Sequence, residues 1–263
     1  MAELHQDIQV ATDDAGIAIV TLNRPAKRNA VTLAMWRELR DLFSGFAERR
    51  EIRAVILTGA GGNFCAGADI SEFPAVRANA EMGRDYEAAA DGATLAIRDC
   101  PRPTIAAVSG YAMGGGCGVA LACDFRVGDA SAKMGIPAAR LGIVYGALDC
   151  GLLYRQVGLA NAKRVLYSAR AFGVEECAEM RLLDQVASGS AIDAARALAA
   201  DFAGNAPLTL QGSKVILEAL AAGTAERRSA EIHGIIDRAM DSADYREGAR
   251  AFIEKRRPAF QGL

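Results

Sequence analysis

The chain has 263 residues, 51% of them hydrophobic, which predicts a substantial buried core and argues against disorder. Thirty basic and 32 acidic residues leave a net charge of −2, so neither nucleic acid nor an anionic membrane is expected as a partner. The chain shows no signal-peptide pattern and no apolar run long enough to cross a bilayer. Six cysteines without a C-x-x-C pair and only two histidines make a metal site improbable, and a cytoplasmic protein with reduced thiols is expected.

The first hundred residues alternate predicted strands and helices. In order, the predicted elements are strands at 8–10 and 16–22, a polar loop at 23–29, an amphipathic helix from Thr32 to Phe46, a buried strand at 54–58, a glycine-rich loop at 59–62, and one or two helices within 71–98. The turn between the first two strands is indicated by Asp-Asp-Ala-Gly at 13–16.

The remaining chain divides into two parts. The predicted elements are a strand at 104–108, a glycine turn, a helix at 115–122, a strand at 123–127, and consecutive helices at 191–203, 208–222, 225–240 and 244–255. Alternating strands and helices are typical of an α/β domain. We therefore predict an α/β core over residues 1–190 and a helical C-terminal region over residues 191–263.

The stretch Val108-Ser-Gly-Tyr-Ala-Met-Gly-Gly-Gly-Cys-Gly118 places three consecutive glycines at the start of a predicted helix. Free backbone N–H groups at a helix start, without side chains over them, suit a phosphate or an oxygen that gains negative charge. The alternative is a close crossing of strand and helix that only glycine permits. The glycine spacing does not fit a dinucleotide-binding fingerprint, and no Walker lysine follows.

A second stretch, Asn63-Phe-Cys-Ala-Gly-Ala-Asp-Ile70, follows the strand at 54–58. Together with Ser109-Gly-Tyr-Ala-Met-Gly-Gly-Gly-Cys117 it resembles the crotonase superfamily, which contains the enoyl-CoA hydratases and isomerases. Further matches are Leu22-Asn-Arg-Pro25 with Arg28-Asn-Ala30, Ala122-Cys-Asp124 with Arg126, and the tail Phe252-Ile-Glu-Lys-Arg256. The resemblance implies a crotonase-like spiral of ββα turns, a C-terminal helical trimerisation region, and assembly as a homotrimer or homohexamer.

The resemblance also implies an acyl-CoA substrate and a set of binding residues. An enolate-like oxyanion would be held by the backbone N–H groups of Ala68 and Gly115, and no cofactor beyond the CoA moiety is expected. Residues implied in CoA binding are Lys27, Arg28, Cys65, Ala66, Ala68, Phe252 and Lys255, the last two often reaching a neighbouring subunit. For the charged residues of this set, ordinary solvated charge is the alternative.

Two positions depart from the pattern of the hydratases. Hydration uses two carboxylates, one after the glycine triplet and one after a proline. This chain has Gly118 in the first place and Ala138, after Pro137, in the second. Neither residue can move a proton, so simple hydration is not expected unless other groups substitute.

Tyr145 is the strongest candidate for a substitute polar group, because methylmalonyl-CoA decarboxylases carry a tyrosine at the same offset. Its hydroxyl would orient a substrate carboxylate or protonate an enolate; the alternative is packing over the pocket mouth. Asp149 is interpreted mainly as an acid favoured by a helix N-terminus. Other groups considered, each with a structural alternative, are Arg140, Glu81, Asp85, Tyr86, Glu87 and His233.

Three functions are compatible with these residues. The first is enolate chemistry on an acyl-CoA: decarboxylation fits best because it needs no base, double-bond isomerisation comes next, and thioester hydrolysis or hydration with substitute acids is the alternative. The second is a hydrolase with Ser109 or Cys117 as nucleophile, for which only His5 and His233 are available. The third is a non-catalytic acyl-CoA binder.

Overall fold

A computed structural model describes residues 7–263 and shows a six-stranded sheet as the centre of the fold. The strands follow the order β1 (Ile8–Thr12), β2 (Ile17–Leu22), β3 (Ala54–Gly59), β4 (Thr104–Val108), β6 (Phe125–Gly128) and β8 (Gln185–Val186). Only the β1–β2 pair within this sheet is antiparallel. A small parallel pair, β5 (Tyr111–Met113) and β7 (Lys133–Gly135), forms a second sheet.

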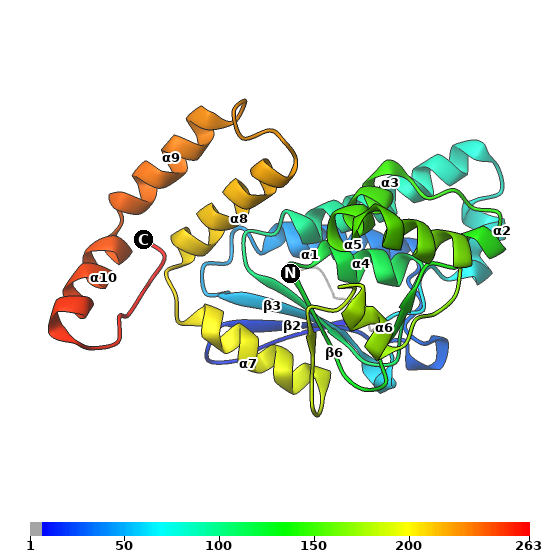
Figure 1. The fold of residues 1–263 in the computed structure, drawn as a ribbon, viewed down its shortest axis with the longest axis horizontal. Helices are drawn as coiled ribbons and strands as arrows, with labels where there is room; N and C mark the ends of the chain where they lie inside the picture. Colours follow the sequence, from blue (N-terminus) through cyan, green and yellow to red (C-terminus); the bar gives the residue numbers. More distant parts are fainter. Residues whose placement is uncertain (1–6) are drawn as a thin grey trace.

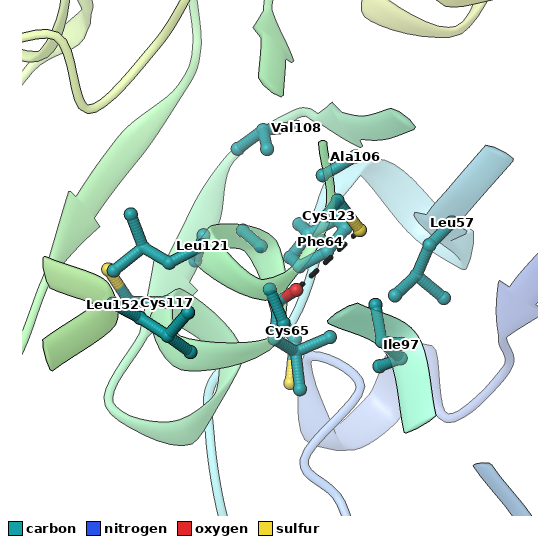
Figure 2. Packing of buried hydrophobic residues seen from close by; sticks show 14 of the residues in the cluster. Leu57, Phe64, Cys65, Ile97, Ala106, Val108, Cys117, Leu121, Cys123 and Leu152 are labelled. Carbon is teal, nitrogen blue, oxygen red and sulfur yellow. Dashed lines mark hydrogen bonds between the residues drawn. The ribbon is translucent and has the colours of Figure 1, made fainter. Parts of the chain in front are cut away.

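The alternation of side chains along the strands divides the core between the two faces of the sheet. In β3, Val55 and Leu57 belong to the larger buried cluster, while Ile56 belongs to the smaller one on the opposite face. The larger cluster is covered by α1 (Leu33–Gly45), α3 (Ala80–Arg98), α4 (Gly115–Ala122) and α5 (Ala147–Ser168) (Figure 1). Figure 2 shows part of this cluster, including Phe64 and Cys65 among residues of the sheet and helices.

The opposite face of the sheet is covered by α7 (Ala191–Ala203), shown in yellow in Figure 1. Ala191, Ala195 and Ala199 lie one helical turn apart and are fully buried in the smaller cluster. Small side chains let the helix approach the strands closely. The first helix of the predicted C-terminal region thus packs as part of the core.

The last three helices, α8 (Pro207–Ala221), α9 (Ser229–Met240) and α10 (Ala243–Glu254), extend away from the sheet (Figure 1). The chain after α10 folds back, because the buried carboxylate of Asp244 accepts hydrogen bonds from the backbone N–H groups of Gln261 (2.7 Å) and Gly262 (2.8 Å). No helix within residues 7–263 is both long and apolar enough to span a membrane.

Most predicted elements match the structure closely. The helix from Thr32 is confirmed, with the Thr32 hydroxyl accepting from Met35 N (3.2 Å) as an N-cap. The predicted turn between strand 104–108 and helix 115–122 in fact contains β5, too short and glycine-flanked to show periodicity. The short α2 (Phe73–Val76) falls within the one or two helices predicted for 71–98, and of α5 only the N-terminal turn at Asp149 was anticipated. Missed were α6 (Val174–Glu179), β7, β8 and four 3₁₀ turns at Pro25–Lys27, Ala60–Gly62, Ile70–Glu72 and Ala138–Arg140.

Candidate active site

The backbone N–H groups of Ala68 and Gly115 face the same cavity, and neither has a hydrogen-bond acceptor among residues 7–263. Val31 N donates to Gly67 O (2.8 Å) and Asp69 N donates to Val31 O (2.9 Å), so the N–H of Ala68 between them points away from this pairing. Gly115 is the first residue of α4, where an N–H has no partner within the helix. The two groups can therefore donate to a ligand.

Close packing brings these two N–H groups together. A Cβ built on Gly115 would lie 3.9 Å from Ala68 N and 3.2 Å from the Trp36 ring, and one built on Gly67 would lie 3.4 Å from Gly115 N. Gly114 precedes the helix with φ of 55°, a conformation that favours glycine, and its own N–H donates to Gly135 O (2.8 Å). The arrangement suits an oxygen that gains negative charge, bound by two N–H donors.

The cavity in front of these groups has a volume of ≈ 160 Å³ and is mainly apolar. Its wall includes Trp36, whose buried indole N–H donates to the hydroxyl of Tyr86 (2.8 Å). The other residues lining it are Ala66, Gly67, Ala68, Ile70, Phe73, Arg77, Glu87, Ala90, Asp91, Gly114, Gly115, Pro137, Ala138, Leu141, Ile143, Val144, Tyr145, Gly146 and Asp149.

The resemblance implies glutamates at two positions of the hydratases, and only one of these positions lines this cavity. Ala138 lines its wall. Gly118 lies on α4, and a Cβ built there would be 3.1 Å from Oδ1 of Asp149. The carboxylate of Asp149 thus fills the space beside Gly118 that a side chain at this position would enter.

Asp149 stands in the first turn of α5, as the sequence-based interpretation assumed, and it also faces the cavity. None of residues 7–263 donates a hydrogen bond to its carboxylate. Burial, together with the nearby charge of Asp91, raises the pKa of Asp149 to about 6. A carboxyl group with this pKa exchanges protons readily near neutral pH.

Tyr145 lies at the same end of the cavity. Its hydroxyl would be 3.3 Å from a Cβ built on Gly114, which places it beside the glycine triplet. Burial, with a smaller effect of Asp149, raises the pKa of Tyr145 well above its usual value. The hydroxyl therefore stays protonated at neutral pH, where it can give up a proton or form hydrogen bonds but cannot act as a base.

The helical wall formed by α2 and α3 contributes charged groups. Arg77 pairs with Glu87 (Nη2 to Oε1, 2.9 Å) and stacks over the rings of Phe73 and Tyr86. Asp91, one turn after Glu87, has a raised pKa through burial and the charge of Glu87. Of the four candidates within 81–87, Tyr86 and Glu87 line the cavity, while Glu81 and Asp85 do not.

Three other candidates lie outside the cavity. Arg140 is exposed at the end of a 3₁₀ turn. His233 is exposed on α9, with Nδ1 2.7 Å from Ser229 O on its own helix. Ser109 donates to Asp129, and burial raises the pKa of the Cys117 thiol to about 12, so neither has the contacts of an activated nucleophile within the described residues. His5 lies outside them.

The residues implied in CoA binding fall into two groups. Cys65 N donates to Tyr111 O and Ala66 N donates to Arg28 O (2.8 and 2.9 Å), so the backbone of 64–68 adjoins Arg28. Arg28 and its neighbour Lys27 are exposed, with the Arg28 guanidinium 5.2 Å from the centre of the Tyr111 ring.

Phe252 and Lys255 lie elsewhere, at the end of α10, a helix that Figure 1 shows well separated from α2, α3 and α4, whose residues help to line the cavity. Phe252 is 86% exposed, which is unusual for a phenylalanine in a folded chain. The structure therefore brings Ala66, Ala68, Gly115 and Tyr145 together at the cavity but leaves these two tail residues away from it.

Sequence reasoning missed Trp36, Arg77 and Asp91 as residues of the site. Asp91 carried no clear signal, because the residues at helical spacing from it include both the charged Glu87 and the apolar Leu95. Trp36 appeared only as one of the apolar positions of a helix. Nothing in the local sequence showed that Arg77 would face the cavity.

The comparisons with known proteins agree on one family. The family model of the enoyl-CoA hydratase/isomerase family matches residues 12–262. YngF of Bacillus subtilis (strain 168), described as an enoyl-CoA hydratase/isomerase, is 34% identical over 255 residues, covering 94% of this chain and 95% of YngF. The short-chain-enoyl-CoA hydratase of Clostridium acetobutylicum is 33% identical over 249 residues, covering 92% of each chain.

Solved structures give the same result. The crystal structure of an enoyl-CoA hydratase/carnithine racemase from Magnetospirillum magneticum has a TM-score of 0.91 at 37% identity, covering 99% of this chain and 97% of that one. This likeness confirms the predicted crotonase-like α/β core with a helical C-terminal region. With its sheet, glycine-rich helix start and cavity, the chain belongs to the enoyl-CoA hydratase/isomerase family of the crotonase superfamily, whose members act on acyl-CoA substrates.

Proposed function

We propose that this enzyme acts on an acyl-CoA thioester through an enolate whose oxygen is bound by the N–H groups of Ala68 and Gly115. The observation that carries the proposal is that both N–H groups face one cavity and have no acceptor among the residues that the structure describes. Each donor of such a pair contributes about 3–4 kcal/mol to transition-state stabilisation. The reaction needs no group beyond the CoA moiety, because proton transfer and enolate binding use the chain's own groups.

Double-bond isomerisation of an enoyl-CoA is the reaction that the cavity supports best. Isomerisation removes a proton next to the thioester and returns it two carbons away, so one carboxyl group suffices. Hydration requires a water molecule to be held and deprotonated, a task for which hydratases use carboxylates at the positions of Gly118 and Ala138. The cavity supplies a carboxyl group at the first of these places only, from Asp149.

Decarboxylation is a second candidate, supported by two polar groups in the cavity wall. The Arg77 guanidinium and the Tyr145 hydroxyl both line it, and they would bind a carboxylate on the acyl group and protonate the resulting enolate. Loss of carbon dioxide produces the enolate without a base. Arg77 is already paired with Glu87, and Asp149 adds negative charge, which makes the cavity less suited to an anionic acyl group.

We also propose how CoA is held. The adenine lies against the backbone of residues 64–68, and Lys27 and Arg28 lie near the phosphates, supported by the bond from Ala66 N to Arg28 O. Phe252 and Lys255 complete the site from a neighbouring copy in a homotrimer or homohexamer. Their exposure at the far end of the chain supports this arrangement.

Mass spectrometry and chromatography of a panel of thioesters test the proposed reaction. The purified protein is incubated with 2-enoyl-, 3-enoyl-, malonyl- and methylmalonyl-CoA, alongside Tyr145→Phe and a control, Tyr167→Phe, which changes an exposed tyrosine of α5. We expect the 3-enoyl and 2-enoyl isomers to interconvert without gain of water. Loss of carbon dioxide, suppressed only in Tyr145→Phe, would instead establish decarboxylation.

Two results of the same panel would contradict the proposal. Efficient gain of water by the 2-enoyl thioester would show hydration, the reaction named for the clostridial relative. Tight CoA binding without turnover or α-proton exchange of any thioester would identify a binder.

A further inference from the structure

Gly118 of α4 has no acidic side chain, and the carboxylate of Asp149 from α5 lies in the space beside it. Gly115 and Gly118 are three residues apart on α4 and lie on the same helix face, so a side chain at 118 would project beside the N–H of Gly115. The 3.1 Å approach of Asp149 Oδ1 to a Cβ at 118 shows that the Asp149 carboxylate occupies that volume.

The surroundings of Asp149 leave its carboxylate available for proton transfer. It receives no hydrogen bond from the described residues, it lines the cavity, and burial favours its protonated form. The titratable and charged groups around it come from four directions: Asp91, Glu87 and Tyr86 on α3, Arg77 after α2, Cys117 on α4, and Tyr145 and Cys150 beside it. Asp91 is the group whose charge acts on it most strongly.

We propose that Asp149 is the residue that carries the proton in this enzyme, acting from α5 in the place of the side chain missing at Gly118. This inference rests on the proposed function, because it requires an enolate at the N–H groups of Ala68 and Gly115. It assigns the acid or base that sequence reasoning left open among Tyr145, Asp149 and the residues of 81–87.

The proton transfer balances with Asp149 alone. The Asp149 carboxylate removes a proton from C2 of a 3-enoyl-CoA, and the electron pair of that C–H bond passes to the thioester oxygen, which the two N–H groups bind. The protonated Asp149 then delivers the proton to C4 as the enolate electrons form the C2–C3 double bond and the C3–C4 double bond is lost. Product leaves with Asp149 ionised again.

Isomerisation of 3-hexenoyl-CoA in deuterated water, followed by chromatography and mass spectrometry over a range of pH, tests the assignment. The proteins compared are the wild type, Asp149→Asn, Asp91→Asn and the control Asp201→Asn, which removes an exposed carboxylate of α7 far from the cavity. We expect kcat/KM of the wild type to rise with pH through a midpoint near 6, because the base form of Asp149 is needed.

The variants have distinct expected results. Asp149→Asn is expected to react on the order of 10²–10⁴-fold more slowly than the wild type. It should also no longer incorporate deuterium at C2, and its rate should no longer show the pH midpoint of the wild type. Asp91→Asn stays active but shifts the midpoint to lower pH, because a neighbouring negative charge no longer disfavours the Asp149 carboxylate. A wild-type rate and pH profile in Asp149→Asn would overturn the assignment while leaving the proposed function intact. A wild type without turnover or exchange would remove the proposed function and the assignment with it.

A relocated carboxyl group provides a second test that does not depend on loss of activity. Asp149→Ala empties the volume beside Gly118, and adding Gly118→Glu returns a carboxyl group to it from α4. We expect the double variant to exceed Asp149→Ala by at least tenfold in rate. Cooperative thermal unfolding would show that the double variant is folded. If the folded double variant were no faster than Asp149→Ala, the two side chains would not occupy the same space, and the assignment would be contradicted.

Discussion

At the scale of single residues, Asp149 combines a chemical use with a cost to folding. Its pKa is raised from 3.8 to about 6 because the folded chain buries the carboxyl group next to Asp91. The unfolded chain therefore ionises this group more readily than the folded one. Between pH 4 and 6 this difference reduces stability progressively, and above pH 6 the full reduction applies.

Asp149→Asn is accordingly expected to stabilise the protein at neutral pH while reducing its activity. At pH 8 the free energy of unfolding should rise by up to about 3 kcal/mol, which corresponds to the difference between a pKa of 3.8 and one of about 6. The gain should vanish below pH 4, where both proteins are uncharged at this position. Chemical denaturation at the two pH values measures the difference. A variant less stable than the wild type at pH 8 would show that the carboxylate has a structural role instead.

At the scale of elements, the site depends on how closely α4 approaches the stretch 63–68. A Cβ built on Gly116 would lie 2.4 Å from Cys65 O and 2.7 Å from its Cβ, so nothing larger than glycine fits this crossing. The alternative first considered for the glycine cluster, a close crossing, is therefore correct for Gly116, while Gly115 lies beside the pair of N–H groups. One triplet serves both packing and the candidate oxyanion site.

Gly116→Ala is expected to lower the free energy of unfolding by on the order of 1–3 kcal/mol through overpacking, and to reduce activity by moving Ala68 relative to Gly115. The matched control is Gly45→Ala at the end of α1, where a Cβ meets nothing within 4 Å and a gain of about 0.5–1 kcal/mol is expected. Urea unfolding and turnover of the same enoyl-CoA measure both effects. Equal stability of Gly116→Ala and the wild type would contradict the crossing described here.

At the scale of the whole molecule, the cavity and the tail lie at opposite ends of one chain. In the proposed arrangement Phe252 and Lys255 reach CoA from another copy, because α10 extends away from the sheet of its own chain (Figure 1). A neighbour that supplies these residues would also cover an exposed phenylalanine. Catalytic groups and tail would then come from different subunits.

Lys255→Ala and Phe252→Ala are expected to raise KM for the acyl-CoA by roughly tenfold or less, with kcat nearly unchanged, because in the proposed arrangement both residues touch only the CoA moiety. Lys163→Ala, which removes an exposed lysine of α5, is the control. Coexpression of the Phe252→Ala chain with an Asp149→Asn chain should form mixed assemblies in which an intact tail meets an intact cavity, and low-KM activity should return. An unchanged KM in both tail variants would refute the shared site.

The sequence by itself predicted the family and most helices and strands, because these rest on ordered motifs, hydrophobic periodicity and helix caps. The family resemblance, and not a local pattern, implied the roles of the two N–H groups. Position 118 could be recognised as lacking its acid from the sequence alone. Only the tertiary structure decided what stands there instead, because Asp149 is thirty-one residues further along and reaches Gly118 only when α5 packs against α4. The raised pKa of Asp149 likewise depends on burial and on Asp91 of α3, a juxtaposition made by folding and invisible to any local pattern.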